Sequence, residues 1–188
     1  MTVYDVIVRR RTIRKFKQQP IERAILEKLV DAARLAPSAA NMQPLKYAIV
    51  DTKDTVDQMF ELVKWAAYIA PAGNPGEGEH PVAFIVILVD TDIRSAGYEL
   101  DVGAAAQNIF LSAEEEGIGT CWMGAIDREK IRGILSLPEK YLINTVIALG
   151  YPAEHPVLET ESGSIKYFKD EEGVLHVPKR KLEDIIVK

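Results

Sequence analysis

The chain has 188 residues, of which 47% are hydrophobic and 27% are charged, and its formal net charge is -5 at pH 7. This composition is typical of one folded domain and excludes an intrinsically disordered chain, which has few apolar residues and a high net charge. The acidic balance argues against a nucleic-acid-binding protein. No apolar run reaches the roughly 20 residues of a membrane-spanning helix. Cys121 is the single cysteine, so no internal disulfide bond forms and a reducing compartment is favoured. The sequence therefore predicts a cytoplasmic protein that binds neither nucleic acid nor membrane.

The first half of the chain predicts three helices, one strand and a long loop. Residues 3–10 are expected to form a short helix, and apolar side chains at helical spacing predict a second over residues 22–36. Residues 45–51 are expected to form a strand. The spacing of apolar residues then predicts a helix over residues 54–67. Residues 71–79 are rich in proline and glycine and are predicted to be a mobile loop.

The second half predicts two strands covered on both faces and two helices. Residues 82–89 form an uninterrupted apolar run, and residues 144–149 resemble it. The alanine-rich stretch 100–116 predicts a central buried helix that ends at Gly117, and Asp127 is expected to cap a helix to about residue 135. From about residue 155 the chain is polar and is expected to be an extended arm that packs on another surface. The pattern indicates an α+β or α/β fold with helices on both sides of a sheet.

Familiar catalytic patterns are absent. There is no glycine-rich phosphate loop of the Rossmann or P-loop kind, and no nucleophile elbow. The three histidines stand singly near prolines, so the sequence predicts no metal site. Cys121 lies in an apolar stretch and is expected to be a buried, inert thiol.

Three segments are candidates for binding a ligand. Residues 10–16 (RRTIRKF) combine arginines, which offer paired donors to phosphate oxygens, with a threonine hydroxyl. The same charges also suit a solvated helix face. Residues 36–44 (APSAANMQP) gather small polar side chains, as a binding rim or an ordinary turn does. Residues 117–125 (GIGTCWMGA) would allow a flat ligand close to the backbone, although the end of a strand explains them almost as well.

Taken together and in this order, these segments resemble the nitroreductase family of FMN-dependent oxidoreductases. The resemblance continues through residues 101–108 (DVGAAAQN), 148–152 (ALGYP) and 178–180 (PKR) and spans nearly the whole chain. It implies an α+β fold, a single domain over residues 1–188 with a central, mainly antiparallel sheet flanked by helices. It also implies an intertwined homodimer in which the arm, from about residue 155, embraces the partner and adds a strand to its sheet, with FMN at the dimer interface.

The resemblance also assigns the residues that contact FMN. Arg10 and Thr12 would hold the phosphate and the ribityl chain, with Arg11 alongside, and Arg14 would lie near the N1/O2 edge of the flavin. Ser38, Asn41 and Gln43 would come from the partner subunit. Met123 and Gly124 would cover one face of the flavin and offer backbone N–H groups to N5 and O4. Either Lys179 or Arg180 would supply a further cation to the phosphate.

The implied reaction is hydride transfer from NADH or NADPH through flavin N5 to a small oxidised acceptor such as a nitroaromatic or a quinone, in a ping-pong sequence. No catalytic side chain is required, because the flavin carries the chemistry. The segment 65–81 is shorter than in larger relatives, which implies an open, sparsely lined substrate pocket. The alternatives are a reductive dehalogenase or flavin-degrading enzyme of the same family, an FMN carrier or regulator without turnover, and a purely structural acidic domain.

Overall fold

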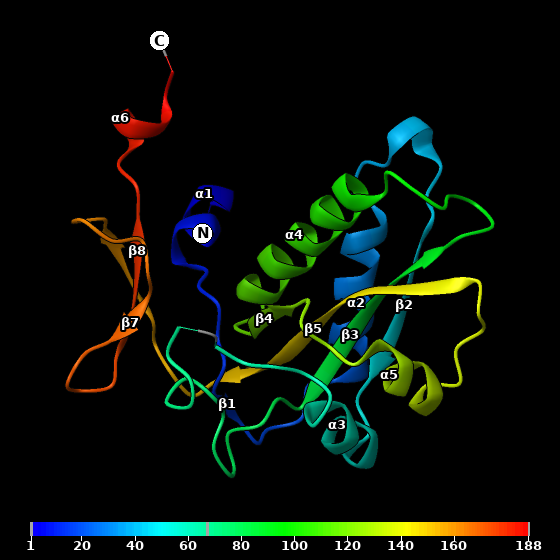
Figure 1. The fold of residues 1–188 in the computed structure, drawn as a ribbon, viewed down its shortest axis with the longest axis horizontal. Coiled ribbons are helices and arrows are strands. Elements are labelled where there is room, and N and C mark those ends of the chain that lie inside the picture. The colour runs from blue at the N-terminus through cyan, green and yellow to red at the C-terminus, as the bar shows by residue number, and fades with distance from the viewer. Residues whose placement is uncertain (1, 67, 188) are drawn as a thin grey trace.

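The computed structural model describes residues 2–66 and 68–187 and shows a five-stranded antiparallel sheet between two layers of helices (Figure 1). The strand order is β1-β5-β3-β2, and β4 also pairs with β5, through residues 146–150. The strands are β1 (Phe16–Lys17), β2 (Leu45–Val50), β3 (Ala83–Asp90), β4 (Gly119–Met123) and β5 (Tyr141–Pro152). All pairings within this sheet are antiparallel, which confirms the α+β fold with a mainly antiparallel sheet.

Both faces of the sheet carry a hydrophobic core. Every residue of β3 is buried, as expected for a continuous apolar strand covered on both sides. One face packs against helices α2 (Arg23–Arg34) and α4 (Glu99–Glu115), and the other against α3 (Lys53–Phe60) and α5 (Arg128–Ile134). Helix α1 (Val3–Arg9) lies at the end of α4 that is distant from the 38–43 loop (Figure 1). The layered arrangement predicted from the sequence is confirmed.

Four of the five predicted helices agree with the structure to within two residues at each end. Gly117 has a φ of +71° and follows α4, as expected for the residue after a helix. The side chain of Asp127 accepts a hydrogen bond from the backbone N–H of Lys130 and caps α5. Helix α1 begins with a capping box between Thr2 and Asp5, in which each side chain accepts from the backbone N–H of the other residue.

The helix predicted over residues 54–67 is wrong in its second half. Helix α3 ends at Phe60, and the chain then leaves helical geometry to pair with the segment that follows β4. The backbone N–H of Lys64 donates to Ala125 O at 3.0 Å, and that of Asp127 donates to Leu62 O at 2.9 Å. Val63 is buried in the structure, and the predicted helix would also have buried it. Its apolar side chain therefore could not distinguish the bridge from the helix. Strand β5 is also longer than the predicted 144–149.

The C-terminal arm contains secondary structure that the sequence did not indicate. Strands β6 (Val157–Thr160), β7 (Phe168–Lys169) and β8 (Leu175–Lys179) form a small separate sheet, with β6 parallel and β7 antiparallel to β8. A short helix, α6 (Leu182–Ile185), follows and projects away from the body (Figure 1). Within this sheet only Leu175 and Pro178 are buried among the described residues. The expectation of an arm with little core of its own is therefore confirmed.

His176 of β8 contacts a carboxylate of β6 and another that directly follows β7. Nδ1 of His176 contacts Glu159 Oε1, and Nε2 contacts Asp170 Oδ2 at 2.9 Å. A histidine ring donates from both nitrogens only when it is protonated. The hydrogen bond to Asp170, and then that to Glu159, raises the pKa of His176 above its usual value.

We expect the C-terminal sheet to loosen as pH rises through this raised pKa. The protonated form stabilises the folded arm fully below about pH 6.5, the usual pKa of histidine, and this contribution is lost above the folded-state pKa. Hydrogen exchange of residues 157–179 as a function of pH measures the effect. His176→Gln should flatten the profile. His155→Gln removes an exposed histidine and should keep the wild-type profile, so a flat profile in that variant would contradict the assignment.

Candidate functional site

The basic segment at residues 10–16 is fastened to the outer edge of β4. The backbone N–H of Ile13 donates to Thr120 O at 3.0 Å, and Thr12 forms an isolated parallel bridge with Thr120. A Cβ added at Gly119 would lie 2.7 Å from Ile13 Cβ, so glycine is what permits this close approach. Glu154 Oε1 accepts hydrogen bonds from the backbone N–H groups of Arg14 and Lys15 at 2.6 and 3.2 Å. The segment is thus held in an extended form against the sheet.

The two adjacent arginines of this segment have different surroundings. The guanidinium of Arg11 donates to Val8 O at 2.6 Å and so caps the C-terminal end of α1. The guanidinium of Arg10 lies over the ring of Phe110, 5.4 Å from its centroid, and makes no hydrogen bond with the part of the chain that the structure describes. Burial, and then the charge of Arg11, lowers the pKa of Arg10, while Glu114 opposes this shift. Arg10 is therefore a partly buried cation whose donors are available to an anion.

Backbone groups at the outer edge of β4 are also available. Thr120 O points outward to Ile13, and because strand residues alternate in direction, Trp122 directs its backbone groups the same way. Met123 points its carbonyl inward, where it accepts a hydrogen bond from the Thr145 hydroxyl at 2.7 Å. Met123 is buried and Gly124 is exposed. Gly124 follows the last residue of β4, and its carbonyl accepts a hydrogen bond from the Arg128 guanidinium at 3.3 Å.

The 38–43 loop is held in place by one buried carboxylate. The hydroxyl of Ser38 donates to Asp101 Oδ2 at 2.7 Å, and the backbone N–H of Ala39 donates to Asp101 Oδ1 at 3.2 Å. Ser38 Oγ in turn accepts from the backbone N–H of Gln43 at 3.0 Å. Ala40, Asn41 and Gln43 have φ values of 51°, 53° and 51°, which non-glycine residues rarely adopt. Such backbone strain is concentrated at functional sites and persists where surrounding contacts enforce it.

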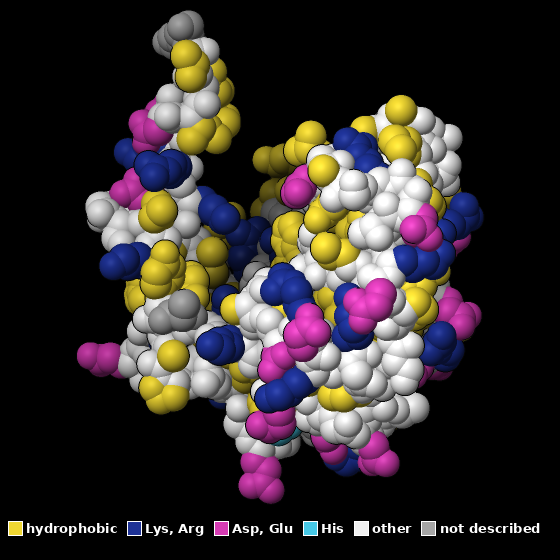
Figure 2. Space-filling model, turned by 45° about the vertical axis from the view of Figure 1, so that its right-hand side comes forward, with side chains coloured by type: hydrophobic (Ala, Val, Ile, Leu, Met, Phe, Trp, Pro, Cys, Tyr) yellow, Lys and Arg dark blue, Asp and Glu magenta, His cyan; other side chains and the backbone are white. Residues whose placement is uncertain are grey.

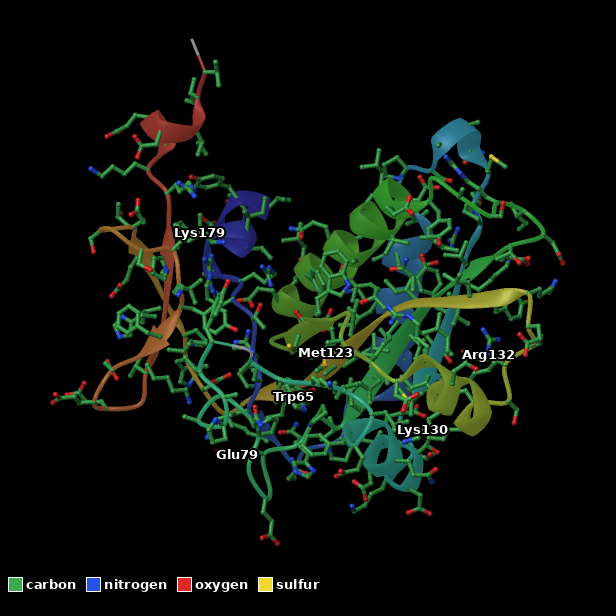
Figure 3. The ribbon with its side chains drawn as sticks, viewed as in Figure 1. Trp65, Glu79, Met123, Lys130, Arg132 and Lys179 are labelled. Atoms are coloured by element: carbon green, nitrogen blue, oxygen red, sulfur yellow. The ribbon has the colours of Figure 1, made fainter. Side chains whose placement is uncertain are left out.

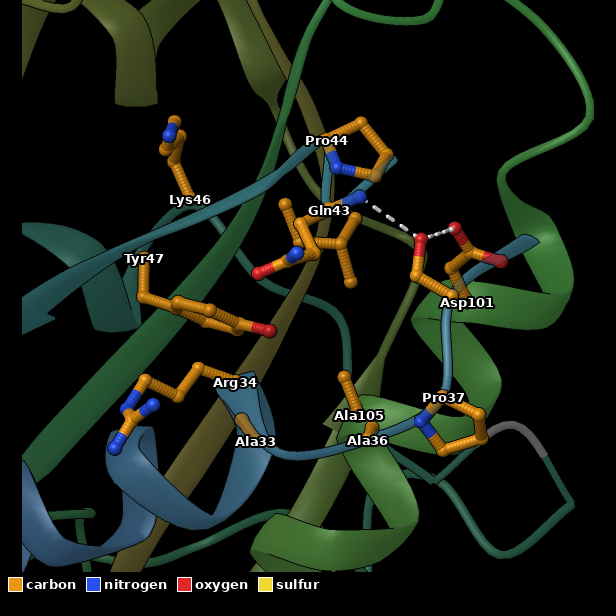
Figure 4. A pocket seen from close by; sticks show the side chains of 12 residues that line it. Ala33, Arg34, Ala36, Pro37, Gln43, Pro44, Lys46, Tyr47, Asp101 and Ala105 are labelled. Carbon is orange, nitrogen blue, oxygen red and sulfur yellow. Dashed lines mark hydrogen bonds between the residues drawn. The ribbon is translucent and has the colours of Figure 1, made fainter. Parts of the chain in front are cut away.

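A cavity of about 210 Å³ lies beneath this loop, between the end of α2, the start of β2 and the start of α4 (Figure 4). The Tyr47 hydroxyl is buried there and has no hydrogen-bond partner among the described residues. Burial raises the pKa of Tyr47 to about 12, so the hydroxyl remains a donor at neutral pH. Figure 4 shows this hydroxyl pointing into the cavity on the same side as Gln43 and Asp101.

The structure does not bring all of the predicted site residues together within one chain. Asp101, which holds the 38–43 loop, and Glu114, which lies near Arg10, are 13 positions apart in α4. That spacing corresponds to about 20 Å along the helix axis. Figure 1 shows the loop at one end of α4, and α1 with the C-terminal sheet at the other. Ser38, Asn41 and Gln43 therefore lie far from Arg10, Thr12 and Arg14 of the same chain.

The two C-terminal cations follow directly from β8. Lys179 is the last residue of β8, and its backbone carbonyl accepts from Glu161 N at 2.8 Å. Both Lys179 and Arg180 are exposed. Figure 3 shows Lys179 on the side of the molecule that carries α1. A hollow with Lys and Arg side chains on its walls separates the arm from the body in Figure 2.

Several residues near these segments were not predicted from the sequence. The Trp122 side chain is 48% exposed and packs against Phe110, with 5.5 Å between the ring centroids. The indole N–H of Trp65 is buried and lacks a hydrogen-bond partner within the described part of the chain. Tyr167 of the arm lies against Arg14. Of these residues, only Trp122 lies within a segment that the sequence analysis selected, residues 117–125.

Cys121 is buried, as predicted, and burial raises its pKa to about 11. A thiol in this state is a poor nucleophile at neutral pH. Residues 2–66 and 68–187 contain no cluster of three or more histidine, cysteine or acidic side chains suited to a metal ion. Over the same residues, no helix has the length and apolarity to cross a bilayer.

Comparison with known proteins identifies the family. The model of the nitroreductase family matches residues 7–151. A protein of Methanothermobacter thermautotrophicus named "Putative NADH dehydrogenase/NAD(P)H nitroreductase" is 34% identical over 161 residues, which cover 83% of this chain and 80% of that protein. The chain belongs to the nitroreductase family.

Solved structures agree with this assignment. The FMN-dependent nitroreductase of Clostridium difficile R20291 is 27% identical, with a TM-score of 0.66 and coverage of 85% of this chain and 90% of that one. A "putative nitroreductase" from Desulfovibrio desulfuricans in complex with FMN is 20% identical and covers 100% of this chain and 96% of that one. Its TM-score of 0.74 shows a likeness in fold that extends through the C-terminal arm.

Proposed function

We propose that this protein is an FMN-dependent oxidoreductase that transfers hydride from NADH or NADPH to small oxidised acceptors such as nitroaromatics or quinones. The observation that carries the proposal is the position of Arg10, whose guanidinium makes no hydrogen bond with the described residues, in the segment that lines the outer edge of β4. FMN, when bound, would supply the redox chemistry of this transfer. The family membership and the FMN-dependent nitroreductase neighbour support this function.

The donors on the chain suit a phosphate ester that carries a flat ring. Arg10 and the Thr12 hydroxyl hold the phosphate and the ribityl chain, and Lys179 or Arg180 adds a second cation. Arg14 would place positive charge near the N1/O2 edge of the ring, and the backbone N–H of Gly124 would donate to the N5/O4 edge. Arg11 caps α1 and thereby orients the basic segment, so its contribution to the phosphate is indirect.

We further propose that the complete site forms in a homodimer. Ser38, Asn41 and Gln43 of the partner subunit complete the set of contacts, since those of the same chain lie at the other end of α4. The apolar side chains of the tail support a second copy as the partner: Leu182, Ile185 and Ile186 are each more than half exposed. The arm of one subunit then packs on the other.

This arrangement predicts a stable dimer of twice 20.9 kDa in solution. Sedimentation equilibrium measures the mass directly. Removing residues 180–188 deletes the exposed apolar tail and should shift the population towards the monomer. A wild-type protein that sediments at 20.9 kDa while retaining FMN would contradict the shared site.

The visible absorption spectrum of the purified protein, before and after anaerobic addition of NADH or NADPH, tests the proposed function. A flavin spectrum that is bleached by either nucleotide supports it and identifies the electron donor. A flavin spectrum that persists would favour a carrier without turnover. A colourless protein that also fails to take up added FMN would refute the assignment of the site.

Arg14→Ala should lower the reduction potential of the bound flavin. A cation near the N1/O2 edge stabilises the negative charge that develops there on reduction, so its removal favours the oxidised form. An effect of about 30 mV corresponds to a tenfold change in the two-electron equilibrium. Spectroelectrochemical titration of the wild-type and variant holoproteins measures it. Equal potentials would remove Arg14 from that edge.

A further inference from the structure

Four side chains from three distant segments form a cluster in which two tyrosine rings contact each other and each also contacts one cation. The guanidinium of Arg14 lies 5.0 Å from the centroid of the Tyr167 ring. The Tyr167 ring lies 5.0 Å from that of Tyr68, tilted by 51°. The ammonium of Lys166 lies 5.8 Å from the centroid of the Tyr68 ring. Tyr167 of the C-terminal arm therefore contacts both Tyr68 and Arg14 of the basic segment.

The cluster stands beside the end of β4. The 62–64 stretch is paired with residues 125–127, immediately after Gly124, through the hydrogen bonds of Lys64 and Asp127. On the other side, Ile13 fastens the basic segment to β4 next to Arg14. Tyr68 comes four residues after Lys64, and Arg14 comes directly after Ile13. Tyr167 thus lies directly over Arg14, the residue that the proposed function assigns to the N1/O2 edge of the flavin.

The cluster offers an exposed aromatic surface in a positive environment. Tyr68 is 63% exposed, so its ring is available for stacking against a planar molecule. Among the described residues, no carboxylate forms an ion pair with Lys166 or with the guanidinium of Arg14. Of the acidic residues beside the basic segment, Glu154 accepts from the backbone N–H of Arg14 and Glu79 pairs with Lys15.

We propose that Tyr68, Tyr167 and Lys166 determine acceptor specificity and select planar aromatic anions, such as aromatic carboxylates that bear a nitro group. The ring of the acceptor stacks on the tyrosines, and its carboxylate lies near Lys166. The inference rests on the proposed function and assigns the substrate class of the same site. Reduction of a nitro group to a nitroso group consumes two electrons and two protons and releases water. NAD(P)H supplies the hydride and the solvent supplies the remaining proton.

The test compares two acceptors of the same shape, 4-nitrobenzoate and its neutral amide, with the flavin-loaded enzyme. The wild type should show a lower KM for the carboxylate, and this preference should weaken as salt is added. Lys166→Gln should raise KM for the carboxylate about threefold, as expected for an exposed charge, while kcat and both constants for the amide stay unchanged. Tyr68→Leu should raise KM for both compounds by about fivefold, and Tyr68→Phe should restore it. Lys53→Gln makes the same charge change on α3 and should have no effect.

Equilibrium binding provides a readout that does not depend on turnover. Benzoate should bind the oxidised holoenzyme more tightly than benzamide by calorimetry, and Lys166→Gln should abolish the difference. A holoenzyme that is reduced by NAD(P)H but treats the charged and neutral acceptors alike in every variant would overturn this inference and leave the proposed function intact. A protein that binds no FMN would overturn both.

Discussion

Arg10→Ala is expected to abolish retention of FMN during purification, with a loss of affinity of about 100-fold. A hydrogen bond to a charged group is worth about 1.5–3 kcal/mol, and each 1.4 kcal/mol is a factor of ten in the dissociation constant. Arg10 has donors available, since its guanidinium contacts only the Phe110 ring among the described residues. Fluorescence titration of the apoprotein with FMN measures the affinity.

Arg11→Ala is the matched control, because it removes the same charge from the neighbouring position. The Arg11 guanidinium is engaged with Val8 O and Ile7 O, so its loss should reduce the stability of α1 by about 1 kcal/mol. The affinity for FMN should fall by much less than in Arg10→Ala. Equal losses of affinity in the two variants would show that the phosphate is held by the charge of the whole segment and not by Arg10.

Gly119→Ala should lower stability and FMN affinity together. Its Cβ would lie 2.7 Å from Cβ and Cγ1 of Ile13, which are too close to the backbone to move without it. Overpacking of this kind costs about 1–3 kcal/mol, or roughly 2–4 °C in Tm per kcal/mol for a chain of this size. The basic segment would have to move away from β4 and carry Arg10 with it. Thermal unfolding of the apoprotein and FMN titration measure the two effects.

Gly133→Ala provides the control for this substitution. A Cβ at Gly133 would meet no atom within 4 Å, and the residue lies within α5. Alanine in a helix is favoured over glycine by about 1 kcal/mol, so this variant should be at least as stable as the wild type and bind FMN equally well. If Gly119→Ala behaved in the same way, close packing of Ile13 on β4 would not be what positions the basic segment.

The sequence predicted the parts of the fold that depend on local pattern. The continuous apolar run of β3 and the alanine-rich α4 each bury a contiguous surface, so their periodicity alone identifies them. Helix α3 was predicted too long because Val63 is buried equally well in a bridge to Ile126. Strands β6 and β8 were not predicted, because they lack the alternating apolar pattern that marks a strand in the sequence. They are held together in part by polar contacts such as those of His176.

Local sequence alone could not predict which residues of the candidate site contact one another. Arg10 and Arg11 are equivalent in composition, and only the end of α1 at Arg9 directs Arg11 back to the helix carbonyls. Asp101 was recognised as part of a motif, but its contact with Ser38 joins positions 63 residues apart. Tyr68 and Tyr167 come together from segments 99 residues apart. Such contacts are set by the tertiary fold, and no spacing in the sequence encodes them.

A site shared between two subunits, as proposed from the separation of its parts along α4, would couple cofactor binding to assembly. If each FMN needs Arg10 of one subunit and Ser38 of the other, the cofactor binds the dimer and not the monomer, and mass action then stabilises the dimer in proportion to the concentration of free FMN. Dilution should therefore release flavin, and excess FMN should delay dissociation of the subunits. Cofactor supply in the cell would then shift the fraction of assembled enzyme, with the apoprotein dissociating at higher protein concentrations than the holoprotein.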